Sequence, residues 1–258
     1  MELHNRVAIV TGGVGAIGLG ICTVLHDRGM RVVVADLEQR ACDDLALELG
    51  GPEGWALGAA VDVSQRASVQ SMVNKVLRHY GQIDALVNNA GIIRLGPLTE
   101  FGEEEWDAVM AVNLKGSFLC AQAVAPTMIA RRCGCIINFA SVAAKRPGPL
   151  QSAYAATKHG VVGLTQVWCQ ELGPHNITVN TVCPGFIESP MWTEQLGPAY
   201  AAAVGVAPGA VLQTLAKAQM PLARPQQPED LGAAVAYLIS ADNVTGQSLV
   251  VDGGFSMH

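Results

Sequence analysis

Short apolar runs alternate with longer segments of helical periodicity along almost the whole chain. Seven runs are apolar nearly throughout, as expected of strands buried on both faces; they cover residues 6–11, 31–36, 55–61, 83–87, 134–140, 177–182 and 248–251. Six segments repeat apolar side chains at helical spacing; they cover residues 19–28, 38–49, 65–80, 103–130, 152–172 and 230–240. This alternation predicts one α/β domain over residues 1–258, with a seven-stranded parallel sheet and helices on both of its faces.

Two stretches depart from this regular alternation. The helix predicted at residues 103–130 contains Pro126, which is expected to break or bend it. Residues 188–227 carry five prolines and no strand pattern. Because a long segment without strands is uncommon unless it has a function, this segment is predicted to form one or two short helices that act as a substrate lid.

Composition narrows the class of protein. Of the 258 residues, 50% are hydrophobic and 15% are charged, and the formal net charge is −6. The chain has no cluster of lysine and arginine, so a nucleic-acid partner is not expected. No apolar run reaches the ~18 residues that span a bilayer, and the first residues lack a signal-peptide pattern. A cytoplasmic protein without a membrane partner is therefore expected.

The seven cysteines indicate free thiols rather than disulfides or a metal centre. Their number is odd, and the chain contains no C-x-x-C motif. Cys133 and Cys135 form the one close pair, and histidine or cysteine partners at zinc-site spacing do not accompany it. The sequence therefore predicts buried thiols and no metal site.

Three side chains near the middle of the chain form a candidate acid–base set. Tyr154 and Lys158 are four residues apart in a predicted helix, so their side chains share one helix face. A cation beside a phenol favours the phenolate and is expected to lower the pKa of Tyr154. Ser141 follows a predicted strand and could bind the same oxygen. A helix that carries one tyrosine and one lysine by chance is the plainer alternative, but the three groups together could move a proton onto or off an alcohol or carbonyl oxygen.

A glycine-rich turn lies between the first predicted strand and the following helix. Gly12, Gly15 and Gly18 would let the backbone approach a pyrophosphate at the helix N-terminus. Asp36 ends the second predicted strand, where a carboxylate can accept both ribose hydroxyls and repel a 2′-phosphate. Positions 13, 14, 15 and 37 carry no arginine or lysine. These features predict that the cofactor is NAD rather than NADP.

Several motifs together resemble the short-chain dehydrogenase/reductase family. Tyr154 and Lys158 match its Y-x-x-x-K signature, with a serine about a dozen residues before the tyrosine. The glycine turn resembles the family pattern T-G-x-x-x-G-x-G, except that Ala16 replaces its middle glycine. Residues 88–91 match the family's N-N-A-G segment, and residues 184–185 its P-G segment. The resemblance covers nearly the whole chain and implies a Rossmann-type doubly wound domain.

The resemblance implies a role for each motif. Tyr154 would be the general acid and base, Lys158 would lower its pKa and hold the nicotinamide ribose, Ser141 would orient the substrate oxygen, and Asn113 would help to carry the proton outward. The implied cofactor contacts are Gly12, Gly15, Ile17, Gly18, Asp36, Leu37, Asp62, Val63, Asn89, Ala90, Gly91, Tyr154, Lys158, Pro184, Gly185, Ile187 and Ser189. The expected substrate contacts are Ser141, Val142, Gln151, Tyr154, Phe186 and Trp192.

The implied activity is NAD-dependent interconversion of a secondary alcohol and a ketone. Residues 189–192, S-P-M-W, look similar to the lid start of bacterial diol and acetoin dehydrogenases, which favours a small polyol, diol or hydroxyketone. A 3-oxoacyl-thioester reductase acting on acyl-carrier protein or coenzyme A is the alternative within the family. A non-catalytic NAD-binding module is the alternative outside the enzymes. The family implies a homotetramer or dimer, paired through the helices at 103–130 and 152–172 and through the last strand.

Overall fold

All seven strands lie parallel in one sheet. The computed structural model describes residues 1–50 and 54–256. The strand order is β3-β2-β1-β4-β5-β6-β7, so the chain winds outward in two directions from the β1–β4 junction. The strands are β1 (Val7–Thr11), β2 (Arg31–Asp36), β3 (Ala56–Ala60), β4 (Ala85–Asn88), β5 (Gly134–Phe139), β6 (Ile177–Pro184) and β7 (Ser248–Val251). The predicted doubly wound parallel sheet is confirmed, and ligands of such sheets bind where the winding reverses.

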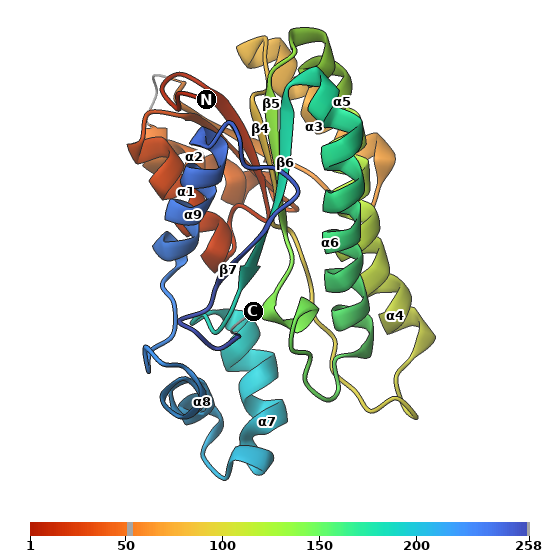
Figure 1. The fold of residues 1–258 in the computed structure, drawn as a ribbon, viewed down its shortest axis with the longest axis vertical. Helices are drawn as coiled ribbons and strands as arrows, with labels where there is room; N and C mark the ends of the chain where they lie inside the picture. Colours follow the sequence, from red (N-terminus) through yellow and green to blue (C-terminus); the bar gives the residue numbers. More distant parts are fainter. Residues whose placement is uncertain (51–53, 257–258) are drawn as a thin grey trace.

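Helices cover both faces of the sheet (Figure 1). One face carries α1 (Ala16–Asp27), α2 (Gln39–Gly50) and α9 (Pro228–Ser240). The other carries α3 (Arg66–Tyr80), α4 (Glu103–Val109), α5 (Gly116–Arg131) and α6 (Ser152–Leu172). Short 3₁₀ turns lie at Val142–Ala144 and Gly173–His175.

The apolar runs follow from burial on both faces of the sheet. Along β2, Val32 and Val34 pack into the core beneath α1, α2 and α9, whereas Val33 packs into the opposite core. Successive side chains of a strand point to opposite faces. Since both faces are covered by helices, most positions are apolar, which is why these strands do not alternate with polar residues. The buried polar exceptions, such as Asn88, Asn138 and Asn180, make hydrogen bonds.

The 188–227 segment lies beyond the carboxyl ends of the strands, next to β7 and the C-terminus (Figure 1). It contains a π-helical turn at Met191–Leu196, α7 (Gly197–Val204), a 3₁₀ turn at Pro208–Ala210 and α8 (Val211–Gln219). Its two ends meet, because Ile187 and Gln226 form a parallel bridge and the Gln226 N–H donates to the Phe186 carbonyl over 2.8 Å. The prediction of one or two short helices is confirmed.

Pro126 does not break its helix. The chain stays helical from Glu103 to Arg131, and Pro126 lies inside α5. Both Pro126 and Gln122, the residue whose carbonyl a proline at 126 cannot bond, are exposed. The irregular turn lies earlier, at Met110–Lys115, where the helix widens to π geometry.

The same helical run bears on the expectation that no apolar run is long enough to span a bilayer. Glu103–Arg131 is long and apolar enough to cross a membrane by length and composition alone. In this structure it is a core helix, because Leu119, Val124 and Met128 pack into the core between the sheet and α3.

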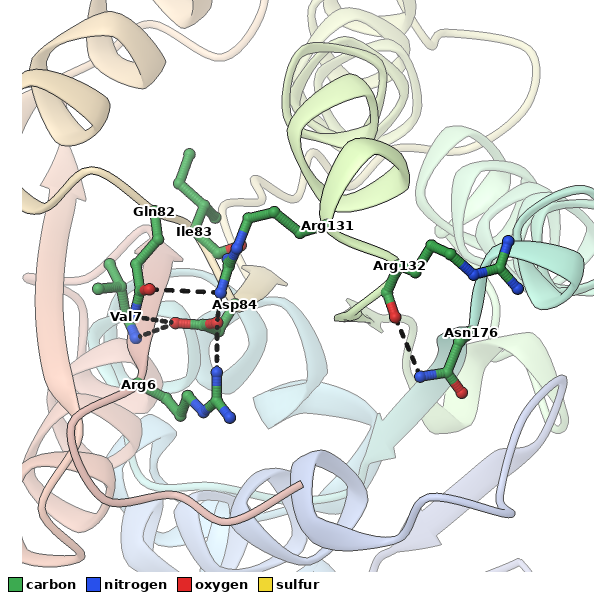
Figure 2. Close-up of polar contacts among 8 residues, drawn as sticks. All are labelled: Arg6, Val7, Gln82, Ile83, Asp84, Arg131, Arg132 and Asn176. Carbon is green, nitrogen blue, oxygen red and sulfur yellow. Dashed lines mark hydrogen bonds and ion pairs between the residues drawn. The ribbon is translucent and has the colours of Figure 1, made fainter.

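A buried carboxylate joins three elements at the amino ends of the strands. Asp84 is fully buried, and its carboxylate accepts hydrogen bonds from Arg131 at 2.9 Å, Arg6 at 3.3 Å and the Val7 N–H at 2.8 Å. The Gln82 amide donates to the same carboxylate over 3.0 Å. Figure 2 shows the two guanidinium groups converging on it, Arg6 from the residue before β1 and Arg131 from the end of α5. The charge is thus paired and fully hydrogen-bonded, as a buried ion requires.

Replacing Asp84 with asparagine is expected to lower the free energy of unfolding by about 3 kcal/mol, because two arginines lose their buried partner. Urea denaturation followed by circular dichroism would measure the change. Asp44→Asn is the matched control, since Asp44 is exposed and pairs with Arg40 at the surface. Equal denaturation midpoints for the two variants would contradict this account.

Candidate active site

A cavity of about 380 Å³ lies where the predicted motifs converge. Its walls come from distant parts of the chain, including Ile17 in α1, Gly91 after β4, Ser141 after β5 and Pro184 at the end of β6. The 188–227 segment contributes further walls, among them Trp192. Because parallel strands end at one edge of the sheet, these loops are brought together there.

Ser141, Tyr154 and Lys158 all line this cavity. Ser141 starts the 3₁₀ turn after β5, and its hydroxyl accepts a hydrogen bond from the Ala143 N–H over 3.1 Å. The Lys158 ammonium donates to the Phe139 carbonyl over 2.8 Å and lies 5.4 Å from the centre of the Tyr154 ring. The structure therefore brings the three predicted groups together at one wall.

The protonation of this set is governed mainly by burial. Desolvation raises the pKa of Tyr154, and the Ser141 side chain opposes this shift by hydrogen bonding. Desolvation also lowers the pKa of Lys158 to about 8. Burial therefore outweighs the lowering of the Tyr154 pKa that was expected, and the part of Lys158 in that lowering stays a prediction. The lysine nitrogen is held by the Phe139 carbonyl beside the tyrosine ring.

Asn113 lies in the π-helical turn between α4 and α5 and is buried. Its side chain accepts from the Ile92 N–H over 2.8 Å and donates to the Ile92 carbonyl over 2.9 Å. It also donates to the Thr157 hydroxyl over 3.2 Å, next to Lys158 in the chain. These bonds tie the loop after β4 to α6 and leave the side chain out of the cavity wall. Its predicted part in proton transfer stays a prediction.

The glycine turn has the shape that a pyrophosphate requires. Gly12 has φ +64°, and a Cβ there would lie 2.9 Å from the Ala90 Cα. A Cβ on Gly18 would lie 2.0 Å from the Gly12 carbonyl oxygen. Gly15 forms the N-cap of α1 without a side-chain cap, so the first-turn N–H groups are available to an anion. Ala16 is accommodated in place of a glycine because it is the first helical residue.

Asp36 lies against this turn. Its carboxylate accepts from the Val14 N–H over 3.1 Å and from the Leu37 N–H over 2.8 Å. Each carboxylate oxygen keeps a free lone pair after one such bond, so both can still accept a ribose hydroxyl. Leu37 is 66% exposed and offers no positive charge to a phosphate. The residues at this end of the site therefore fit the ribose of a nicotinamide cofactor.

Asn89 connects the loop after β4 to the glycine turn. Its amide donates to the Thr11 and Gly12 carbonyls over 2.9 and 3.0 Å, while the Ala90 N–H donates to the Thr11 hydroxyl over 3.1 Å. The Asn89 side chain and the Ala90 backbone thus hold the turn in place.

Asp62 and Val63, two of the predicted cofactor contacts, lie in the turn after β3. One oxygen of the Asp62 carboxylate accepts from the Ser64 N–H and hydroxyl over 2.9 and 2.7 Å, so it closes its own turn. Val63 is buried, and a Cβ on Gly116 would lie 2.8 Å from its side chain. The contacts of Asp62 and Val63 with a cofactor stay predictions.

The cavity wall includes many, though not all, of the predicted residues. All predicted substrate residues line it: Ser141, Val142, Gln151, Tyr154, Phe186 and Trp192. Of the predicted cofactor residues, those at the nicotinamide end line it: Ile17, Asn89, Gly91, Tyr154, Lys158, Pro184, Gly185, Ile187 and Ser189. The cofactor residues outside the wall are Gly12, Gly15, Gly18, Asp36, Leu37, Asp62, Val63 and Ala90.

Sequence reasoning missed several wall residues. Phe255, near the C-terminus, packs on Phe186 with ring centres 4.8 Å apart, and Phe186 packs on Trp192 at 5.1 Å. The Arg146 guanidinium lies 4.6 Å over the Phe255 ring and donates to its carbonyl over 3.3 Å. Tyr200 reaches the wall from α7. No spacing or motif marks these residues in the sequence, because each meets the site only through tertiary contacts.

A doubly wound sheet with a glycine turn at its switch point and a tyrosine–lysine pair in the adjoining cavity defines a Rossmann-like oxidoreductase. The family model described as short chain dehydrogenase matches residues 6–198. The chain belongs to the short-chain dehydrogenase family, as the motifs predict.

Relatives and a solved structure agree with this assignment. The chain is 40% identical over 256 residues to the 3-oxoacyl-(acyl-carrier-protein) reductase FabG of Thermotoga maritima, covering 98% of this chain and 99% of that protein. It is 37% identical over 258 residues to the D-threitol dehydrogenase of Mycolicibacterium smegmatis, covering 99% and 95%. The crystal structure of gox2181 matches with a TM-score of 0.87 and 31% identity, over 98% of this chain and 97% of that one.

Proposed function

We propose that this oxidoreductase uses NAD to interconvert a secondary alcohol and its ketone. The observation that carries the proposal is the convergence of Ser141, Tyr154 and Lys158 on a cavity that also meets the predicted nicotinamide end of the cofactor site. When bound, the nicotinamide ring would accept or donate the hydride. The protein supplies orientation and a route for the proton.

The transfer of the substrate proton is assigned to Tyr154. In alcohol oxidation its phenolate takes the hydroxyl proton, and in ketone reduction its phenol returns it. Ser141 holds the substrate oxygen beside it, and Lys158, with its pKa lowered to about 8, is a proton-exchanging group within the same wall. Asn113 positions α6 through Thr157. The side chains of Ser141, Tyr154 and Lys158 come together in the cavity at the carboxyl edge of the sheet.

Asp36 supports NAD over NADP. Its carboxylate lies beside the Val14 N–H at the glycine turn, where a 2′-phosphate would meet a like charge. Leu37 follows it without a compensating cation.

A small diol, polyol or hydroxyketone is the proposed substrate. The nicotinamide and the substrate must share about 380 Å³, which leaves room for a small molecule. Apolar side chains such as Phe186, Trp192 and Phe255 form much of the wall, so the carbon skeleton would be bound by apolar contact. The 188–227 segment would serve as the lid. The D-threitol dehydrogenase relative is consistent with a polyol.

Reduction of a 3-oxoacyl thioester is the second candidate. It is favoured by the FabG relative at 40% identity. Arg146, an exposed cation in the cavity wall, could also meet the phosphates of a thioester carrier.

Homotetramer or dimer formation is also proposed. On the helical run Glu103–Arg131 and on α6, Phe118 is 38% and Val167 50% exposed, while a Cβ on Gly163 would meet no atom within 4 Å. Strand β7 is an edge of the sheet. Pairing of these surfaces would bury apolar area and cover a sheet edge.

A spectrophotometric screen at 340 nm tests the proposed function. Purified protein is assayed with NAD and with NADP against polyols, vicinal diols, cyclic alcohols and 3-hydroxyacyl thioesters. Turnover of diols or polyols with NAD is expected. Turnover mainly of acyl thioesters with NADP would establish the second candidate instead, and NAD binding without turnover of any alcohol or ketone would indicate a non-catalytic binding module.

A further inference from the structure

Two polar side chains meet in the otherwise apolar part of the cavity wall. Gln151 lies at the N-cap of α6, and Tyr200 lies on α7 in the 188–227 segment. The Gln151 Nε2 donates to the Tyr200 hydroxyl over 3.0 Å, and both residues line the cavity. The Tyr200 hydroxyl in turn donates to the Pro149 carbonyl over 3.0 Å.

These bonds determine which way the Gln151 amide faces. A tyrosine hydroxyl has one hydrogen, and here the Pro149 carbonyl takes it. The oxygen of Tyr200 can then only accept, so the Gln151 group that faces it must be the NH₂ and not the carbonyl. The Gln151 carbonyl oxygen is on the other side, where the Gly148 N–H donates to it over 3.4 Å.

The oriented amide keeps unused hydrogen-bonding capacity. An amide NH₂ has two hydrogens and its carbonyl oxygen two lone pairs, so one hydrogen and one lone pair remain after the bonds to Tyr200 and Gly148. Gln151 also stands three residues before Tyr154, at the same end of α6. Both residues line the same cavity, so one small substrate can present one oxygen to Tyr154 and a second oxygen to this amide.

We infer that Tyr200 is a positioning residue, which holds the Gln151 amide so that it recognises a second oxygen of the substrate beside the reacting one. The inference rests on the proposed function and narrows it to vicinal diols and α-hydroxyketones. A substrate hydroxyl can accept a hydrogen bond from the free N–H of Gln151 or donate one to the free lone pair of its carbonyl. A plain alkyl group leaves both of these amide groups without a partner. Since Tyr200 belongs to α7, this recognition also depends on the placement of the 188–227 segment over the cavity.

Matched substrates that differ by one oxygen test the inference. The ketone pair is 3-hydroxybutan-2-one and butan-2-one, and the alcohol pair is butane-2,3-diol and butan-2-ol, each assayed with the full-length protein and its nicotinamide. Tyr200→Phe keeps the ring and removes the hydroxyl. It is expected to lower kcat/KM about tenfold for the member with the second oxygen and to change the plain member less than about twofold. Gln151→Leu is expected to show the same selective loss.

The double variant separates positioning from packing. If Tyr200 acts through Gln151, adding Tyr200→Phe to Gln151→Leu produces no further loss, whereas two independent contacts would add. Equal losses for both members of a pair, no loss, or additive losses would each overturn the inference while leaving the proposed function standing. Wild-type protein that turns over neither member, or acyl thioesters alone, would overturn the proposed function and the inference with it.

Discussion

Replacing Tyr154 with phenylalanine is expected to lower kcat for alcohol oxidation about 100-fold or more. The ring and its packing remain, but the group that takes the hydroxyl proton is gone, and general acid–base catalysis contributes about 10²–10⁴-fold. Since burial raises the pKa of Tyr154, wild-type oxidation is expected to accelerate as pH rises and the phenol loses its proton. The variant is expected to lose this acceleration, because phenylalanine does not titrate.

Two measurements isolate the role of the hydroxyl. Binding of NADH, followed by fluorescence titration, is expected to survive in Tyr154→Phe because the glycine turn and Asp36 are untouched. Tyr237→Phe makes the same chemical change on α9, where Tyr237 is 53% exposed, and is expected to leave kcat unchanged. Full activity of Tyr154→Phe would remove Tyr154 from the chemistry.

Replacing Asp36 with alanine and Leu37 with arginine is expected to reverse the cofactor preference. The change removes a carboxylate that would repel a 2′-phosphate and adds a guanidinium that pairs with it. We expect kcat/KM for NAD to fall about tenfold or more and kcat/KM for NADP to rise about tenfold or more, each tenfold step corresponding to about 1.4 kcal/mol. Initial rates with the two nicotinamides and one shared alcohol give the ratio directly.

Removing a different exposed carboxylate provides the control for the change in cofactor preference. Asp44→Ala on α2 also removes an exposed carboxylate, and it is expected to leave the ratio between the two nicotinamides unchanged. A ratio that shifts equally in both variants would mean that overall charge, and not the position of Asp36, decides the preference.

Much of the architecture could be predicted because it rests on local patterns. Parallel strands buried on both faces are apolar along most of their length, so runs such as residues 31–36 are recognisable without a partner strand. The glycine turn was predictable for a similar reason: Gly12 and Gly18 stand where a side chain would collide with the backbone. Element boundaries were less exact, since α1 begins at Ala16, three residues before the predicted start.

Other features could not be predicted, because distant groups decide them. The irregular turn of the long helix was not predicted, and it lies at Met110–Lys115, next to the bonds between Asn113 and Ile92. The turn after β3 was not predicted either, and the bonds from Ser64 to the Asp62 carboxylate close it. Neither outcome is visible in the spacing of residues along the chain.

By itself, the sequence determined the class of fold, and it located the glycine turn and the candidate acid–base residues, because each depends on residue type at short spacing. Only the tertiary structure decided how those groups behave. The Phe139 carbonyl holds Lys158 beside the ring of Tyr154, and burial sets the pKa values of both residues. Likewise, Tyr200 meets Gln151 across 49 positions of the chain. Solvent exclusion and long-range hydrogen bonds arise only when the segments pack together.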